Sequence, residues 1–212
     1  ITVNAGDGTL NFSPSNLNLR GVAGTTTITS AIDTSGASGK TLTVEGTAIN
    51  LNGDLTTDGG LISFTGPVTV NKGSATAVGT GAGGGDVTFG STLTLSSGGN
   101  DDLTITAGTG AVTLTGAVAL NDNDLTVASS QNSVITAGIS GSTGALDITD
   151  SGTTDINGDL AMSGTGTITL DAASLGADVT TVGGAIDFSG AVTGDKGSAT
   201  AVGTGAGGGD VT

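Results

Sequence analysis

The stretch that decides the fold is GLISFTGPVTV at residues 60–70. The same pattern returns as GDVTFGSTLTL at residues 85–95 and as GAVTLTGAVAL at residues 110–120. GAIDFSGAVTG at residues 184–194 repeats it, and TAINLNGDL at residues 47–55 is a shorter relative. Apolar residues alternate with polar or small residues in these segments, and this period of two is typical of strands with one buried face.

A small residue stands in the middle of each full copy of the pattern, at a position where the alternation calls for an apolar one. These residues are Gly66, Ser91, Gly116 and Gly190. We interpret them as corners at which the backbone bends around the core. A further short strand follows the pattern, as in DLTIT at residues 102–106. One such unit of about 25 residues cannot close a core alone, whereas a stack of coils buries a continuous one.

A longer repeat encloses these units. NKGSATAVGTGAGGGDVT at residues 71–88 recurs as DKGSATAVGTGAGGGDVT at residues 195–212, an offset of about 124 residues. The same offset aligns residues 54–70 with residues 178–194. The sequence therefore predicts an internal super-repeat of this length that contains several coils.

Together these repeats predict an all-β fold, a parallel β-solenoid with about 8–9 coils of about 25 residues. We treat residues 1–212 as one continuous segment, with super-repeat copies at residues 1–124 and, in part, 125–212. An antiparallel sandwich array of the kind found in bacterial adhesins is the alternative. The subrepeat and the scarcity of hairpin dipeptides (Asn52-Gly53 and Asn157-Gly158 are the exceptions) favour coils.

Parallel stacking of such coils fixes the expected neighbours. Phe64, Phe89 and Leu114 should form one inward ladder with adjacent Cα atoms roughly 5 Å apart. Phe188 is expected in the equivalent place of the second super-repeat. The strands expected at residues 1–3 and 209–212 show no cap, so we expect the stack to continue in both directions. Further copies in the same polypeptide, or end-to-end contacts between subunits, would continue it.

The composition excludes several classes of function. The chain has no His and no Cys, so it lacks the residues of a thiol nucleophile, a Ser-His-Asp triad and a usual zinc site. Four Lys and Arg residues against 19 Asp and Glu residues give a net charge of −15, which does not suit nucleic-acid binding. The apolar runs are too short for a membrane-inserted helix.

Two glycine-containing motifs match nucleotide-binding patterns only in part. Residues 79–84 read GTGAGG and satisfy G-x-G-x-x-G, but a strand and not a helix is expected after them. SGKT at residues 38–41 resembles the end of a phosphate-binding loop, but Thr34 stands where the first glycine is required. We interpret both segments as loops.

Acidic turns are the only candidate metal ligands. The candidates for calcium are Asp101, Asp102, Asp122 and Asp124. Calcium takes six to eight oxygen ligands, and stacked turns could supply some of them. The alternative is that these residues form solvated turns that start strands, and the prediction includes no required cofactor.

Neither a glycosidase site nor an ice-binding surface is favoured. Asp147, Asp155 and Asp187 could supply the two carboxylates of a glycosidase. They stand at ordinary strand or turn positions, however, and aromatic residues make up only 2% of the chain. Thr-x-Thr recurs at residues 27–29, 41–43, 92–94, 104–106, 113–115 and 167–169. A flat array of this motif can bind ice, but threonine is also the ordinary polar residue of an outward strand position.

Residues 85–118, GDVTFGSTLTLSSGGNDDLTITAGTGAVTLTGAV, resemble the repeat regions of filamentous-haemagglutinin-type and autotransporter-type bacterial surface proteins. The resemblance extends over essentially the whole chain. It implies a right-handed parallel β-helix and an exported, elongated protein at the bacterial cell surface or outside the cell. Such a protein acts as an adhesin, as a spacer or as a building unit of an extracellular matrix.

The expected function is therefore that of a structural repeat segment of an extracellular fibre, stalk or giant surface protein, without enzymatic activity. Its expected partner is a further copy or a continuation of itself, end to end. The alternative is an adhesin module that binds glycans or proteins through loops at residues 71–85 and 128–144.

Overall fold

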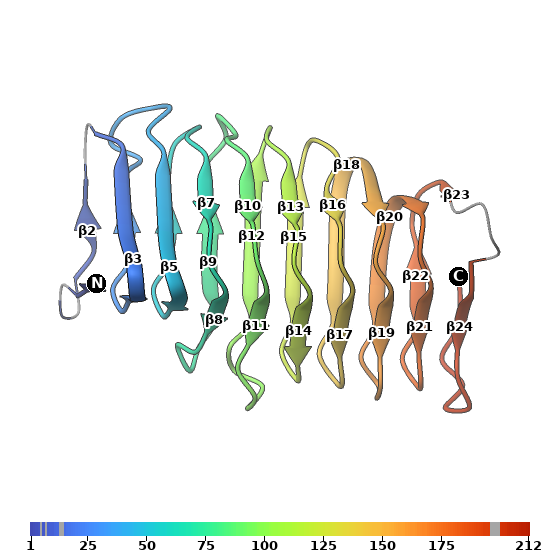
Figure 1. The fold of residues 1–212 in the computed structure, drawn as a ribbon. Helices are drawn as coiled ribbons and strands as arrows, with labels where there is room; N and C mark the ends of the chain where they lie inside the picture. The colour runs from blue at the N-terminus through green and yellow to red at the C-terminus, as the bar shows by residue number, and fades with distance from the viewer. Residues whose placement is uncertain (5, 7, 13–14, 196–199) are drawn as a thin grey trace.

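The computed structural model describes residues 1–4, 6, 8–12, 15–195 and 200–212. The described chain forms a long stack of strands from the N-terminal end to the C-terminal end (Figure 1). It contains 24 strands and no helix, and every pairing between its strands is parallel. The fold is a parallel β-solenoid of about nine turns, which confirms the predicted fold class.

Each coil crosses three faces of the solenoid, which we number in the order in which the chain crosses them. Face 1 contains the first parts of β3 (Leu17–Ile28) and β5 (Leu42–Leu51), then β7 (Ile62–Phe64), β10 (Val87–Phe89), β13 (Val112–Leu114), β16 (Val134–Ile135), the last parts of β18 (Leu146–Ile156) and β20 (Ile168–Leu175), and β23 (Val192–Gly194). Face 2 contains β1 (Thr2–Val3), the last parts of β3 and β5, then β8 (Val68–Val70), β11 (Leu93–Leu95), β14 (Val118–Asn121), β17 (Ile139–Gly141), β19 (Leu160–Met162), β21 (Val179–Thr181) and β24 (Val202–Thr204). Face 3 contains β2 (Leu10–Asn11), β4 (Ile32–Asp33), β6 (Leu55–Thr56), β9 (Thr76–Gly79), β12 (Leu103–Gly108), β15 (Leu125–Ser129), the first parts of β18 and β20, and β22 (Ile186–Phe188).

The inward ladder on face 1 is confirmed. Phe64, Phe89 and Leu114 pair in register on neighbouring strands and are at most 1% exposed. The two phenylalanine rings stack with their centroids 4.5 Å apart. Each inward side chain packs on its counterpart in the next coil, so the buried residues form one core along the rod.

The length of a coil changes along the rod. On face 1, Val87 pairs with Val112, whereas Leu42 pairs with Ile62 after a shorter stretch of chain. Beyond β13 the coils on this face are shorter than the coil from Val87 to Val112, and they shorten again beyond β18. The predicted coil length is therefore correct for only some of the coils.

Phe188 does not lie in the predicted place. It pairs with Leu170 on face 3, whereas Phe64 lies on face 1. Residues that pair in register on successive strands of one face form a column. The column that contains Phe64 reaches Leu175 five coils later. Phe188 lies two faces further along the chain than Leu175. The later coils are shorter, so the super-repeat does not span a whole number of coils.

The described strand pairings nevertheless correspond in the two repeated segments, which we call the first cassette (residues 54–88) and the second cassette (residues 178–212). In the first, β6 pairs with β9 and β7 pairs with β10. In the second, β21 pairs with β24, and Ile186 forms a bridge with Val211. The first cassette begins on face 3 and the second on face 2, so the second is rotated by one face about the rod axis.

The small residues in the middle of the pattern do lie at corners. Gly66 lies between β7 and β8, and a Cβ atom there would collide with the carbonyl oxygen of Gly46 in the preceding coil. A Cβ atom at Gly116 would collide with the backbone of Ser91 in the same way. The stacked corners pack too closely for a larger side chain at these two positions.

Candidate functional site

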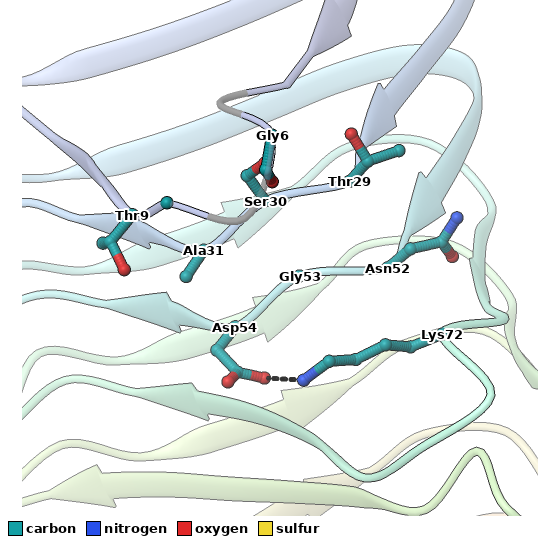
Figure 2. A pocket seen from close by; sticks show the side chains of 10 residues that line it. Gly6, Thr9, Thr29, Ser30, Ala31, Asn52, Gly53, Asp54 and Lys72 are labelled. Atoms are coloured by element: carbon teal, nitrogen blue, oxygen red, sulfur yellow. Dashed lines mark hydrogen bonds and ion pairs between the residues drawn. The ribbon is translucent and has the colours of Figure 1, made fainter.

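A cavity of about 360 Å³ lies on the edge where the chain passes from face 2 to face 3, near the N-terminal end (Figure 2). The turns at residues 29–31 and 52–54 form its floor. Gly6 and Thr9 lie on one side of it and Lys72 on the other.

An ion pair forms one wall of this cavity. The Lys72 Nζ donates to Asp54 Oδ1 at 2.8 Å and to the carbonyl oxygen of Ala75 at 2.9 Å. The same Asp54 oxygen accepts the backbone N–H of Ala77 at 3.0 Å. The Lys72 side chain is 27% exposed and that of Asp54 is 43% exposed, so water screens the pair. Its main effect is to hold the loop at residues 71–75 against the edge.

The remaining lining of the cavity is uncharged and combines polar side chains with Ala31 and glycines. Thr9 and Thr29 contribute hydroxyl groups, and Asn52 contributes an amide whose Oδ1 accepts the backbone N–H of Asn71 at 3.2 Å. Asp54 and Lys72 are the only ionisable residues in the described lining, and they neutralise each other. The cavity can therefore form hydrogen bonds with a polar ligand such as a sugar, but its described lining lacks a nucleophile with an adjacent base.

A second hollow, of about 240 Å³, lies further along the same edge. Its lining residues are Asn121, Ser140, Gly141, Ser142 and Ser163. The Asn121 backbone has a φ of 55°, a left-handed conformation that asparagine tolerates better than most residues. Its side-chain amide donates to the carbonyl oxygen of Leu95 at 2.6 Å. The edge between faces 2 and 3 thus carries two polar hollows, on either side of the loops at residues 71–75 and 96–102.

The predicted calcium candidates lie on the same edge, in two adjacent coils, but each of them already accepts a hydrogen bond from the protein. They are Asp101, Asp102, Asp122 and Asp124. Asp101 is 4% exposed and accepts the N–H of Gly73 at 2.6 Å. Asp102 accepts the N–H of Asp124 at 2.9 Å, and Asp122 accepts the hydroxyl of Thr143 at 3.3 Å. The described residues include no group of three or more metal-binding side chains.

The bond between Asp102 and Asp124 belongs to a pattern that our sequence analysis missed. Six aspartates stand directly before an inward Leu or Val, and the Oδ1 of each accepts a backbone N–H of the next coil at 2.7–3.1 Å. They are Asp54, Asp86, Asp102, Asp124, Asp159 and Asp178. The Asp-Leu or Asp-Val pair is visible in the sequence. Its partner can be named only when the coil length is known.

A buried carboxylate on the edge between faces 3 and 1 was also missed. Asp150 is 3% exposed and accepts three hydrogen bonds, from the Ser129 hydroxyl at 2.9 Å, the Ser133 backbone N–H at 3.0 Å and the Thr154 hydroxyl at 2.9 Å. Ser129 and Ser133 belong to one coil, and Asp150 and Thr154 to the next. The four residues therefore tie two coils together from the inside.

The structure does not bring the three carboxylates considered for glycoside hydrolysis together. Asp147 and Asp187 belong to one column of face 3, with Thr169 between them, and Asp155 lies on face 1. Residues 79–84 begin with the last residue of β9 and continue into the connection to β10, and residues 38–41 precede β5. Neither segment leads into a helix, as expected.

The Thr-x-Thr motifs are distributed over all three faces, two on each. Residues 41–43 and 113–115 lie on face 1, residues 27–29 and 92–94 on face 2, and residues 104–106 and 167–169 on face 3. They do not form one continuous array. No helix in the described chain has both the length and the apolar character to cross a membrane.

Comparison of the chain with protein-family models, with curated proteins and with solved structures finds no match. Function must therefore be inferred from the coil architecture, from the chemistry of its edges and from the sequence pattern. What the chain is shown to be is a repetitive all-β parallel solenoid.

Proposed function

We propose that this chain is a structural repeat segment of an exported bacterial fibre, stalk or giant surface protein, located at the cell surface or outside the cell. The observation that carries the proposal is the uninterrupted stack of coils around one core. Each coil contacts only its neighbours, so additional coils lengthen the rod without changing its cross-section. A rod built in this way sets the distance between the parts that are attached to it.

The surface chemistry supports this role. The outward positions of the faces carry mostly small polar residues such as Thr88 and Thr113, and the net charge is −15. A uniform negative charge keeps rods soluble and opposes lateral aggregation. The resemblance to filamentous-haemagglutinin-type and autotransporter-type repeats supports the same role. The proposal includes no enzymatic activity, no cofactor and no nucleic-acid partner.

Immunogold electron microscopy of intact cells that produce the protein tests the proposal. Antibodies against the purified chain should label elongated material outside the cell, and labelling should disappear when the antibody is first adsorbed with that chain. Labelling confined to the cell interior would contradict it.

The second candidate is an adhesin module, and the two polar hollows on the edge between faces 2 and 3 favour it. Glycan-array binding of the purified chain tests this candidate. Asn52→Ala, at the floor of the first hollow, should weaken binding at least tenfold, because a hydrogen-bonding group in a binding site is lost. Thr88→Ala, on face 1, is the matched control and should bind as the wild type does. Equal binding by all three proteins would contradict this candidate.

A further inference from the structure

The turn sequence Asn-Gly-Asp-Leu occurs twice in the chain, at residues 52–55 and 157–160. In both copies the aspartate accepts a backbone N–H of the next coil, Asp54 from Ala77 at 3.0 Å and Asp159 from Asp178 at 3.1 Å. The first turn lies on the edge between faces 2 and 3, and the second on the edge between faces 1 and 2. The same Asn-Gly dipeptide is therefore present in two structural settings.

Coil stacking requires the glycine in both turns. A Cβ atom at Gly53 would collide with the carbonyl group of Ser30, and one at Gly158 would collide with the backbone of Ala137, in each case in the preceding coil. A glycine leaves its backbone nitrogen unshielded by a side chain. Neither glycine N–H donates a hydrogen bond within the part of the chain that the structure describes. Both nitrogens are thus available to attack the side-chain carbonyl carbon of the preceding asparagine.

The two asparagine side chains are held differently. Asn52 is half-buried, and its Oδ1 accepts the N–H of Asn71, the residue opposite it in the next coil, at 3.2 Å. Asn157 is exposed, and the residue opposite it is Gly176. The Gly176 N–H donates instead to the carbonyl oxygen of Ile156 at 2.7 Å. Among the described residues the Asn157 side chain has no hydrogen-bond partner, so no such bond has to break before it turns toward Gly158.

We propose that Asn157 is a site of spontaneous deamidation in the folded chain and that its hydrogen bond protects Asn52. This inference goes beyond the proposed structural function and does not depend on it. The Gly158 nitrogen attacks Cγ of Asn157, and its proton passes to the side-chain nitrogen. The bond between Cγ and that nitrogen breaks, ammonia leaves, and a cyclic succinimide remains. Water then opens the ring at either carbonyl and gives aspartate or isoaspartate.

The products change a turn that holds two coils together. Both products add a negative charge to the turn that contains Asp159. Isoaspartate also adds one methylene group to the main chain, in a turn that packs on the backbone of Ala137 and leads to the bond between Asp159 and Asp178. The glycine that stacking requires thus makes this turn chemically reactive.

Peptide mapping of the purified wild-type chain by mass spectrometry, during incubation at mildly alkaline pH, tests the inference. Deamidation changes the mass of a peptide by the difference between an amide and a carboxylic acid, and electron-based fragmentation distinguishes isoaspartate from aspartate. In the folded chain, residue 157 should convert at least about fivefold faster than residue 52, because at Asn52 a hydrogen bond of ordinary strength must break first.

The chain unfolded in guanidinium chloride is the matched control. Both sites share the sequence Asn-Gly-Asp-Leu, so without the fold they should convert at closely similar rates. Asn157→Gln assigns the reacting residue, since glutamine forms its larger cyclic imide far more slowly. In the folded variant the rapid conversion should disappear, and the rate at residue 52 should stay unchanged.

Equal rates at the two sites in the folded chain, or faster conversion at residue 52, would overturn the inference. It would also be overturned if residue 157 stayed intact in the folded chain while the unfolded chain converted. A preference for residue 157 that is as large in the unfolded chain as in the folded one would show that the fold does not cause it, and would overturn the inference as well.

Discussion

Asp150 illustrates how one charged side chain is accommodated in a largely aliphatic core. Burial of an ion is costly unless its lone pairs are satisfied, and here two hydroxyls and one backbone N–H satisfy them. The partners come from two coils, so the network exists only when those coils are stacked in this register. The alternating pattern of the sequence places Asp150 inside, but it does not identify the three donors.

Replacement of Asp150 by Ala should lower the free energy of unfolding by about 2–4 kcal/mol, because three buried donors lose their acceptor. Asp122→Ala is the matched control, since Asp122 is exposed and forms a single hydrogen bond of 3.3 Å. The control should change stability by less than about 0.5 kcal/mol. Urea unfolding measures both, and equal losses would contradict the assigned network.

The hydrogen bonds that aspartates accept from the next coil lead to a second prediction for a single residue. Asp86 Oδ1 accepts the backbone N–H of Ala111 at 2.9 Å. Asp86→Ala should therefore cost about 1 kcal/mol, and Asp86→Asn, which keeps an oxygen acceptor, should retain most of that energy. Hydrogen exchange at the Ala111 amide should accelerate in the alanine variant only. Unchanged exchange would contradict the role of Asp86.

At the scale of the strand and its corner, the fold can be predicted from the sequence because two requirements are strict. In the repeated pattern, inward positions must be apolar, and the corner position must be small. Alternation identified the inward residues of β7, β10 and β13, and the small residue in the middle identified the corners. Steric exclusion by the preceding coil explains Gly66 and Gly116, because a Cβ atom at either position would collide with the backbone of that coil. A longer bend, as in β3, imposes no such requirement at Gly24, where a Cβ atom would meet nothing within 4 Å.

Gly66→Ala should therefore destabilise the fold by several kcal/mol, or prevent folding, because the added Cβ collides with the Gly46 carbonyl. Gly24→Ala is the control and should be neutral or slightly stabilising, since it only reduces the freedom of the unfolded chain. Thermal unfolding followed by circular dichroism compares them. A Gly66→Ala protein as stable as the wild type would show that the corners are not packed as described.

At the scale of the whole molecule, the parallel stack could be predicted from the sequence, but the lengths of the later coils, and hence the face on which each later residue lies, could not. The pattern is clear at residues 60–120, and there the coils on face 1 have the expected length. Residues 125–175 depart from it, and their coils are shorter because the turns that join their strands are shorter. Inward alternation does not encode turn length, so neither the later coils nor the place of Phe188 could be predicted.

The consequence is that a contact encoded twice in the sequence occurs on two different edges of the rod. Asp54 accepts the N–H of Ala77, and Asp178 accepts the N–H of Ala201, at 3.0 Å in both cassettes. The first contact lies where the chain enters face 3 and the second where it enters face 2. The same cassette sequence thus begins on face 3 in one copy and on face 2 in the other, so the described strand pairings within a cassette do not depend on the face on which it begins.

One pair of cysteines tests this central claim most directly. Thr169 and Asp187 are neighbours on face 3, in register on adjacent strands, so their Cα atoms should lie about 4.8 Å apart. In a rod whose coils all had the length of the one from Val87 to Val112, Asp187 would instead neighbour Met162. We predict that Thr169→Cys with Asp187→Cys forms an intramolecular disulfide under mild oxidation, and that Met162→Cys with Asp187→Cys does not. The opposite result, a disulfide at 162–187 and none at 169–187, would contradict the rotated second cassette.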